Sequence, residues 1–494
     1  MKKRILHIFL FAAALALGVL VAAKLTVRKT EMGTLMQEKT QADVLFFGTS
    51  HVNFGILPGE LWAQNGITAY NCAVNGEPMR VTKWAIRSAV EQKRPKLIVL
   101  DVYSLSVWRD NVSAGAVHSS LDWAPLNQTK LEMTKDLLPK EDRMEVLFPF
   151  ARYHARWREL TKEDFEGKQT LYGGTPGTNI AQYFAPTELL PQTEMLDEYD
   201  QPAEALREIA AYCRKENIPL VLTELPGPNA ADQQRYINAA AQVAKEYDLP
   251  YYDMDRMEIV RKETDYNDIS MAESGEMGYH LNVSGAGKVT RWLGNVLQNQ
   301  YALPDHRGES GYEAWEEKYD AYHQQLAAEI ASETNLYTLL LRLADPGFSA
   351  AVVIPQQSNL IHDANAMALL QNLGLAPDTE RLAQDCYMGV SDTDTASVQE
   401  MWNSGEYSWY NANGSAVCKV GFERCYDGEP YSNPSVIAGG EDRSHRVYND
   451  LDRQPDKIDV QIVVVDNRSK TVIAAPAFSL SSTLWSYRKS RSGQ

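Results

Sequence analysis

Ser50 and His280 are the two side chains of this sequence best suited to covalent chemistry. Ser50 ends the stretch Phe-Phe-Gly-Thr-Ser at 46–50, so we expect it where a buried strand gives way to a helix. A backbone N–H at such a junction is well placed to stabilise an oxyanion. His280 comes just before a helical pattern at 283–299. A serine nucleophile needs such a base, because its own pKa lies far above 7.

Each of these residues also has a plainer interpretation. A serine that follows a strand commonly does no more than cap the next helix, and a single histidine is more often structural than catalytic. The spacing around the serine is not Gly-x-Ser-x-Gly, because Val52 stands where the second glycine would be. The strained turn of the α/β-hydrolases is therefore absent. The serine and the histidine together are more specific than either alone.

Residues 43–300 supply the elements that must position these side chains. Apolar runs alternate with helical patterns, which predicts an α/β fold of three layers, with a sheet of parallel strands covered on both faces. We expect strands at 44–48, 67–74, 97–103, 219–225 and 251–253, and helices at 81–92, 204–215, 232–247 and 283–299.

The stretch 104–200 interrupts this alternation and is rich in aromatic residues, among them Trp108 and Trp157. We expect an insertion over the carboxyl edge of the sheet, where open α/β sheets bind ligands. The alternative is a small helical cap whose aromatic side chains form a core of their own.

We divide the rest of the chain by its changes in composition. The main domain covers 30–303, a helical linker follows at 304–334, a smaller mixed α/β domain covers 335–484, and 485–494 is a polar tail. Within the smaller domain we expect helices at 336–343 and 365–373, a strand at 349–354, and a hairpin of strands 460–466 and 471–478.

The first 29 residues decide the expected compartment. Residues 5–23 are apolar apart from His7, and a helix of about 19 residues spans about 28 Å, close to a hydrocarbon core. Three basic residues precede this run and would stay cytoplasmic. We predict a single-pass membrane anchor at 1–29 with the body outside. The alternative is a signal peptide cleaved after Val-Ala-Ala at 21–23, which would leave a secreted protein.

Charge and composition exclude several classes of function. The net charge is −17, and removing 1–29 leaves 42 basic against 65 acidic residues, a net charge of −23. Such a body repels nucleic acid. The chain has no Gly-x-Gly-x-x-Gly, no Walker loop, no Cys-x-x-Cys and no His-Glu-x-x-His, so we expect neither a cofactor nor a metal. Five cysteines are too few for a disulfide framework, although Cys418 and Cys425 flank a hairpin that a disulfide could close.

The sequence resembles the SGNH, or GDSL-type, hydrolases and acyltransferases. Gly-Thr-Ser-His at 48–51 is similar to the first sequence block of that family, and His-Leu-Asn-x-x-Gly-Ala at 280–286 to the fifth. The stretch 71–76 is similar to the second block, whose glycine, here Gly76, supplies a backbone N–H to the oxyanion hole. The resemblance covers 43–300 and implies that Ser50 is the nucleophile and His280 its base.

The sequence departs from the family pattern in two places. Met277 stands where an aspartate usually precedes the histidine, so Glu276, Glu273 or Asp268 could supply the carboxylate, and we assign Glu276. The usual Gly-x-Asn-Asp is also absent, and the corresponding strand end reads Leu-Asp-Val-Tyr at 100–103. The residues that we expect to contact substrate or replace the missing oxyanion donor are His51, Asn75, Gly76, Tyr103, Trp108 and Trp157.

Two further resemblances extend this interpretation. Residues 147–149 and 153–157 are similar to the membrane-anchored SGNH proteins of the AlgX and DltD type, which partner membrane-bound O-acyltransferases. Residues 339–374 and 461–478 resemble the interleukin-like EMT inducer (ILEI) domain, which implies a small mixed α/β module attached to a carbohydrate-processing enzyme.

Together the resemblances imply an extracytoplasmic O-acyltransferase or esterase that acts on a cell-surface polysaccharide by serine nucleophilic catalysis, with acetyl as the expected acyl group. The implied partners are a surface glycan and a membrane-bound O-acyltransferase that delivers the acyl donor. A second class stays open: a catalytically decayed SGNH scaffold that binds glycan or assembles with the acyltransferase. The two departures from the family pattern favour it.

Overall fold

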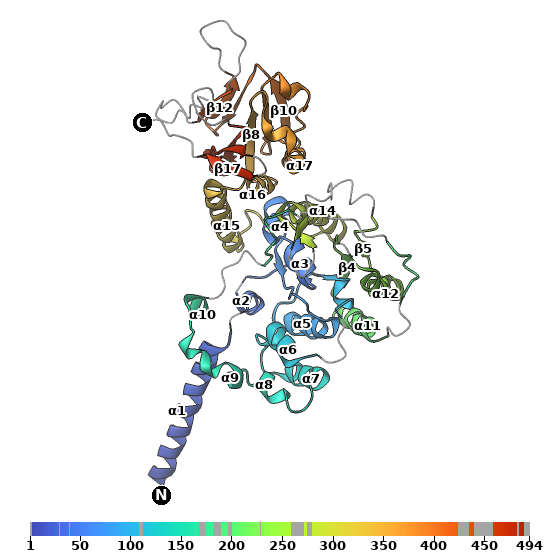
Figure 1. Ribbon diagram of the computed structural model, residues 1–494. Helices are drawn as coiled ribbons and strands as arrows, with labels where there is room; N and C mark the ends of the chain where they lie inside the picture. Colours follow the sequence, from blue (N-terminus) through green and yellow to red (C-terminus); the bar gives the residue numbers. More distant parts are fainter. Residues whose placement is uncertain are drawn as a thin grey trace. The chain divides into compact units, whose positions relative to one another are not determined.

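The chain forms two compact units. The first consists of Met1–Pro176, Ala185–Thr264 and Lys288–Glu317, and the second of Gly177–Phe184, Asp265–Gly287 and Lys318–Gln494. The chain therefore passes from the first unit to the second three times and returns twice, so that it ends in the second. The computed structural model (Figure 1) describes residues 2–28, 30–38, 40–107, 112–166, 173–180, 189–195, 200–227, 229–257, 271–273, 279–422, 434–438, 458–481 and 484–488.

A sheet of five parallel strands forms the centre of the first unit. Its order is β2-β1-β3-β4-β5, and all residues of β1, β3 and β4 are buried, as expected of strands that helices cover on both faces. This confirms the predicted α/β fold with a parallel sheet. The strands are β1 (Val44–Phe47), β2 (Ala69–Asn71), β3 (Leu97–Asp101), β4 (Leu220–Glu224) and β5 (Tyr251–Asp253).

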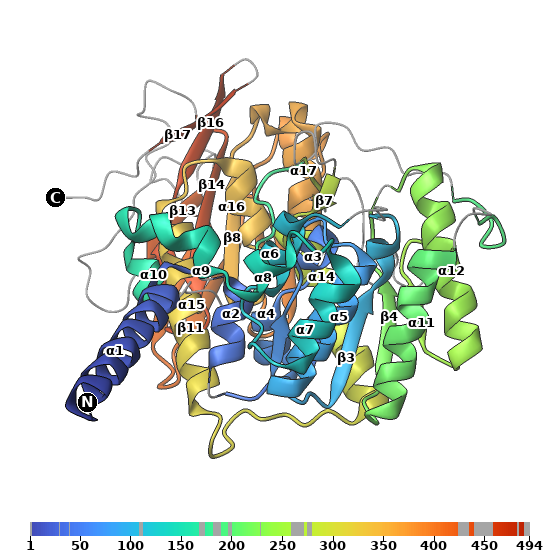
Figure 2. The same ribbon diagram turned by 90° about the horizontal axis from the view of Figure 1, so that it is seen from below.

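The direction of each crossover connection determines which face of this sheet its helices cover. The connection from β1 to β2, through α3 (Ser50–Gly55) and α4 (Pro58–Asn65), runs opposite to the later connections, which contain α5 (Met79–Gln92), α11 (Asp200–Lys215) and α12 (Ala231–Tyr247). Because parallel crossovers are right-handed, the two sets lie on opposite faces. Figure 2 shows α11 and α12 side by side.

The helix α14 (Val283–Tyr301) packs against α4 within the first unit. The side-chain amide of Asn65 donates hydrogen bonds to Asn295 Oδ1 at 3.1 Å and to Gln298 Oε1 at 2.9 Å. Gly294 allows this close approach, because a Cβ there would lie 2.5 Å from Asn65 Oδ1. The contact thus covers the face of the sheet opposite α5.

The described part of the insertion is mainly helical up to residue 166. A 3₁₀ turn η1 (Val102–Leu105) follows β3, and further on come α6 (Ala114–Leu121), α7 (Gln128–Leu137), α8 (Arg143–Leu147), α9 (Phe150–Tyr153), η2 (His154–Arg158) and α10 (Lys162–Glu166). The N-terminal helix α1 (Lys2–Thr26) protrudes from the unit (Figure 1), and α2 (Glu31–Gln37) follows it. Contacts join α9, η2 and α10 to α1, and the Arg156 guanidinium donates to the Thr26 carbonyl oxygen at 2.7 Å.

Antiparallel sheets make up the second unit. A seven-stranded sheet has the order β10-β9-β8-β14-β16-β17, with β15 also paired to β14, and a three-stranded sheet has the order β11-β12-β13. The strands are β8 (Phe348–Ile354), β9 (Tyr387–Asp392), β10 (Ser397–Trp402), β11 (Glu406–Tyr410), β12 (Ala416–Phe422), β13 (Pro434–Ala438), β14 (Val460–Asp466), β15 (Thr471–Ala474), β16 (Ala477–Ser481) and β17 (Leu484–Arg488). A separate pair joins β6 (Met271–Glu273) to β7 (Tyr279–Leu281).

Alternating side chains bury both faces of the larger sheet. Val352 and Ile462 belong to an apolar core that includes residues of α15 (Glu313–Ser332), α16 (Leu336–Arg342) and α17 (Ala364–Asn372). The neighbouring residues Val353 and Val463 belong to a second core, together with Trp409 of the three-stranded sheet. Two short 3₁₀ turns, η5 (Asn359–His362) and η6 (Arg381–Ala383), complete the unit. The second unit is therefore a mixed α/β structure.

The structure corrects one predicted strand. The stretch 471–478 is not a single strand of a hairpin, because β15 ends at Ala474 and β16 begins at Ala477. Pro476 lies between them and has no N–H to give to a ladder. Both strands nevertheless pair with β14, at its end and at its beginning respectively.

Candidate active site

Ser50 lies at the point where the crossover direction of the parallel sheet reverses. It is the first residue of α3, just beyond the carboxyl end of β1, and β1 lies between β2 and β3. In open α/β sheets ligands bind beyond the strand ends at such a reversal. The predicted junction of strand and helix at Ser50 is confirmed. The helix is capped by Thr49, whose hydroxyl accepts the His51 N–H at 3.4 Å.

Gly48 is needed for this junction. Its φ is +156°, and a Cβ on it would lie 2.6 Å from Val52 Cγ2 and 2.9 Å from Asp101 Cβ. A larger residue would therefore push β1 away from β3 and shift the helix that begins at Ser50.

Asn71 fixes the far end of the same helix. Its side-chain amide donates to the Val52 carbonyl at 2.8 Å and to the Ile56 carbonyl at 2.9 Å, and its own oxygen accepts the Ala73 N–H at 3.2 Å. The residue is 4% exposed. The sequence analysis included Asn71 only as part of a family block and missed this role, which a polar residue at the end of a buried strand could have signalled.

The loop with Asn75 and Gly76 lies beside α3. Asn75 Oδ1 accepts a hydrogen bond from Asn53 Nδ2 at 3.0 Å, and Asn53 is in the first turn of α3. The Val74 N–H donates to the Gly48 carbonyl at 3.2 Å. Gly76 has a φ of +69°, a conformation that favours glycine. The structure thus places both residues near the serine-bearing helix, while their oxyanion roles stay predictions.

The His51 ring contacts the segments that follow β3 and β4. It stacks on Tyr103, with ring centroids 3.7 Å apart and an angle of 21° between the planes. A Cβ on Gly227 would lie 3.0 Å from His51 Cε1, so the ring also lies against the chain after β4. The Tyr103 hydroxyl accepts a hydrogen bond from Gln233 Nε2 at 2.8 Å. Two of the predicted substrate-contacting residues are therefore in direct contact.

A group of buried carboxyls lies at the same strand ends. Asp101 accepts the backbone N–H groups of Tyr103 at 3.2 Å and Leu225 at 2.9 Å, but burial raises its pKa to about 7. Glu224 ends β4 and accepts the Asn229 amide at 2.8 Å. Burial raises the Glu224 pKa well above its usual range, and the charges of the neighbouring carboxylates Asp101 and Asp255 raise it further.

These carboxyls hold protons that exposed acids would lose. Both are fully enclosed, and like charges close together cannot all ionise. The raised pKa values of Asp101 and Glu224 therefore favour their protonated forms near neutral pH. The sequence analysis missed this group. Its signal was present: an acidic residue is the last residue of each of the three strands at 97–101, 220–224 and 251–253.

His280 lies in β7, where it pairs with Ala272 of β6. It is 5% exposed, and burial lowers its pKa, so the imidazole is neutral near pH 7, as a general base must be. His280 and Ser50 belong to different compact units. Their pairing stays a prediction.

Several predicted residues lie outside the described residues. Glu276, Trp108 and Cys425 are among them, so their roles and the disulfide to Cys418 stay predictions. Trp157 is described, in η2, and is 62% exposed. Within the described part of the chain, no three histidine, cysteine or acidic side chains are grouped so that they could hold a metal ion.

Comparisons with known proteins show little. No family model and no curated protein matches this chain. Among solved structures, a mutant of the esterase AlinE4 is similar over 54% of this chain and 100% of its own, with 14% identity and a TM-score of 0.21. A likeness this low supports no conclusion about fold or activity.

Proposed function

We propose that the protein is an extracytoplasmic serine-dependent esterase or O-acyltransferase that acts on a cell-surface polysaccharide. The observation that carries this proposal is the position of Ser50, at the start of a helix and at the reversal point of a parallel sheet. Ligands bind at this position in open α/β sheets. The resemblance to SGNH enzymes assigns the same serine as nucleophile. The polysaccharide, the acetyl group and the acyltransferase partner are inferred from that resemblance alone.

In the proposed reaction Ser50 Oγ attacks an acyl carbonyl carbon while His280 accepts the hydroxyl proton. The carbonyl oxygen becomes an oxyanion near the backbone N–H groups of Ser50 and Gly76. The intermediate collapses to an acyl-serine, and the leaving alcohol takes the proton from His280. A sugar hydroxyl or water then attacks the acyl-serine, with His280 again as base, and the serine is restored.

We further propose that α1 anchors the protein in a membrane. The stretch Arg4–Ala23 has a mean hydropathy of 2.6, none of it is buried, and its length suffices to cross a bilayer. Trp157 and Phe165, which are 62% and 64% exposed, lie in η2 and α10 beside α1. Aromatic side chains gather at membrane interfaces. We infer that this segment rests on the lipid headgroups, which leaves Trp157 in the interface and not in the substrate site.

A second candidate is a decayed scaffold that binds glycan. One observation favours it: the end of β3, where SGNH enzymes carry a side-chain oxyanion donor, is occupied by Asp101. Its carboxyl accepts two backbone N–H groups and, unlike a side-chain amide, has no N–H group to donate to an oxyanion. Losing one such donor typically lowers rates about 10²–10³-fold.

Hydrolysis of p-nitrophenyl acetate by the full chain in detergent distinguishes the two candidates. If the protein is an enzyme, Ser50→Ala should lower the rate of hydrolysis by several orders of magnitude and leave the free energy of unfolding nearly unchanged. The matched control is Ser113→Ala, because Ser113 caps α6 by accepting the Ala116 N–H at 3.2 Å. It should cost about 0.5–2 kcal/mol of stability and no activity. Equal rates of hydrolysis in wild type and Ser50→Ala would contradict the proposed serine-dependent enzyme and favour the glycan-binding scaffold.

A further inference from the structure

The second unit contains a pocket of about 320 Å³, at the lower end of the range for small-molecule sites. One wall is β11 with Val417 of β12, and the other is formed by the turns that follow β9 and β14. All of its lining lies within the second unit. The pocket is therefore independent of Ser50 and of the proposed reaction.

Aromatic side chains form the first wall. Tyr407 and Trp409 are in edge-to-face contact, with ring centroids 4.9 Å apart at 71°. The ladder between β11 and β12 shifts register between Trp409 and Tyr410. Such a bulge turns a side chain out of the regular alternation. Tyr410 lines the pocket as well and is 59% exposed, so its ring is a free surface for a flat apolar ligand.

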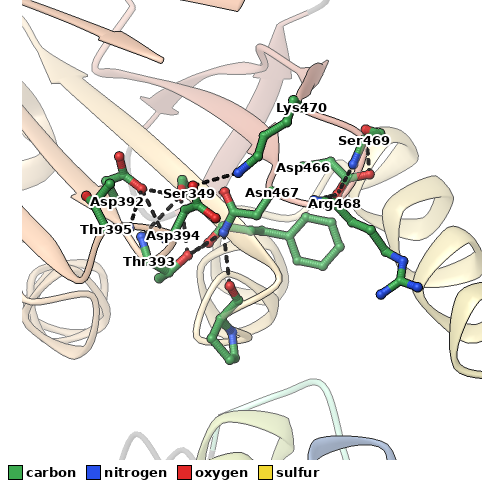
Figure 3. A network of polar contacts seen from close by, with 12 residues as sticks. Ser349, Asp392, Thr393, Asp394, Thr395, Asp466, Asn467, Arg468, Ser469 and Lys470 are labelled. Carbon is green, nitrogen blue, oxygen red and sulfur yellow. Dashed lines mark hydrogen bonds and ion pairs between the residues drawn. The ribbon is translucent and has the colours of Figure 1, made fainter. Parts of the chain in front are cut away.

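Figure 3 shows the opposite, polar wall. Asp392 Oδ1 accepts the Ser349 hydroxyl at 3.1 Å and the N–H groups of Asp394 and Thr395 at 3.1 and 3.3 Å. Its other oxygen accepts the Tyr407 hydroxyl at 2.6 Å. These four donors hold the carboxylate in place before any ligand arrives.

The remaining charges of this wall are also compensated. Lys470 Nζ lies 2.6 Å from Asp394 Oδ2 and forms an ion pair with it. The Asn467 side chain lies between the two turns, where it donates to Thr393 Oγ1 at 2.7 Å and to the Pro346 carbonyl at 3.0 Å. Asp394 and Lys470 therefore neutralise each other, and Asp392 keeps its negative charge but already accepts four hydrogen bonds from neutral donors.

One polar group of the lining residues has no hydrogen-bond partner among the described residues. The Trp409 indole N–H is buried and has no hydrogen-bond partner among the described residues, although the residue is only 6% exposed. Buried donors are nearly always paired. Trp409 lines the pocket, so this wall contains hydrogen-bonding capacity that the described residues do not use.

We propose that this pocket binds a neutral sugar ring. A pyranose has a flat C–H face, which packs on an aromatic ring. It also has hydroxyls that both donate and accept, which suit the fixed polar wall. A cationic ligand would need an unpaired carboxylate, and an anion an unpaired cation. Asp394 and Lys470 are paired with each other, and both oxygens of Asp392 already accept hydrogen bonds, so the wall favours a neutral ligand over either ion.

Saturation-transfer NMR on the full chain in detergent tests this proposal. The probes are the methyl pyranosides of glucose, galactose, mannose and N-acetylglucosamine, each at millimolar concentration, with choline as the cationic and glucuronate as the anionic comparison. We expect saturable binding of at least one neutral glycoside. Preferential binding of choline or glucuronate, or no binding of any neutral probe, would overturn the proposal.

Three variants locate the binding. Tyr410→Ala should weaken it about tenfold or more, since it removes an exposed ring that stacks on the sugar. Tyr410→Phe keeps the ring and should bind as wild type. The matched control is Val398→Ala, on β10 of the same unit and 50% exposed, which should change nothing. Unchanged binding in Tyr410→Ala would overturn the proposal, whatever the outcome of the esterase assay.

Discussion

Replacing Glu224 by glutamine should flatten the pH dependence of stability in the first unit. Because burial raises the carboxyl pKa values of Asp101 and Glu224 in the native state, the native state holds their protons more tightly than the unfolded chain does. Their protonated forms stabilise the fold at low pH. This contribution is lost as the pH rises from the unfolded values near 4 through the native values.

The size of the effect follows from Asp101. Its pKa is about 7 against an ordinary value of 3.8, and a tenfold change in proton affinity is about 1.4 kcal/mol. Raising the pH from 4 to 8 should therefore lower the free energy of unfolding by about 4 kcal/mol through this group alone. That is a large share of the about 5–15 kcal/mol by which domains are stable.

Glu224→Gln keeps the acceptor for Asn229 and removes a neighbouring charge. Asp101 should then ionise more easily, and the loss of stability between pH 5 and pH 8 should fall by about half, since one of two coupled protons is gone. Amide hydrogen exchange of β3 and β4, corrected for the intrinsic rate at each pH, measures opening of the first unit alone.

The matched control is Glu246→Gln. Glu246 forms a surface ion pair with Arg207 at 2.7 Å, which lowers its pKa. Its contribution disappears only as the pH falls below its usual range, so this variant should keep the wild-type slope between pH 5 and pH 8. A wild-type stability that rises over this interval, or an unchanged slope in Glu224→Gln, would refute the reasoning.

Three other outcomes are expected. Asn71→Ala removes two buried hydrogen bonds and one partly buried hydrogen bond around α3 and should cost about 3 kcal/mol in urea unfolding. A loss below about 1 kcal/mol would show that α3 is stable without these bonds. A protease added to intact cells should degrade the body, and its survival while a known surface protein is digested would contradict the proposed topology. Brominated lipids should quench less tryptophan fluorescence in Trp157→Phe than in wild type, and equal quenching would remove Trp157 from the interface.

The sequence predicted local features well, because they depend on neighbouring residues. The apolar runs at 44–47 and 97–101 mark buried strands by themselves, and the alternation with helices implies the parallel sheet. The position of Ser50 at a strand end follows from the same pattern. Pro476 could have revealed the break between β15 and β16, but the apolar residues on both sides concealed it.

Contacts between distant segments could not be predicted in this way. The stack of His51 on Tyr103 and the approach of Asp101 to Glu224 depend on strand order, which periodicity does not specify. The pocket of the second unit requires two turns that lie 74 residues apart, at Thr393 and Asn467, to meet beside β11. A single bulge before Tyr410 then determines which rings line it.

The pairing of α4 with α14 also determines the order in which the chain can fold. Asn65 and Asn295 are 230 residues apart, and ribosomes add about 5–20 residues per second. One side of the nascent sheet must therefore wait about 10–50 s for its covering helix. During that interval the side chain of Leu61, which lies against Gly294 of α14 and is 0% exposed in the finished fold, is open to other chains. If the chain is exported, this vulnerable period coincides with its passage across the membrane, and a holding chaperone would be most useful between the synthesis of α4 and of α14.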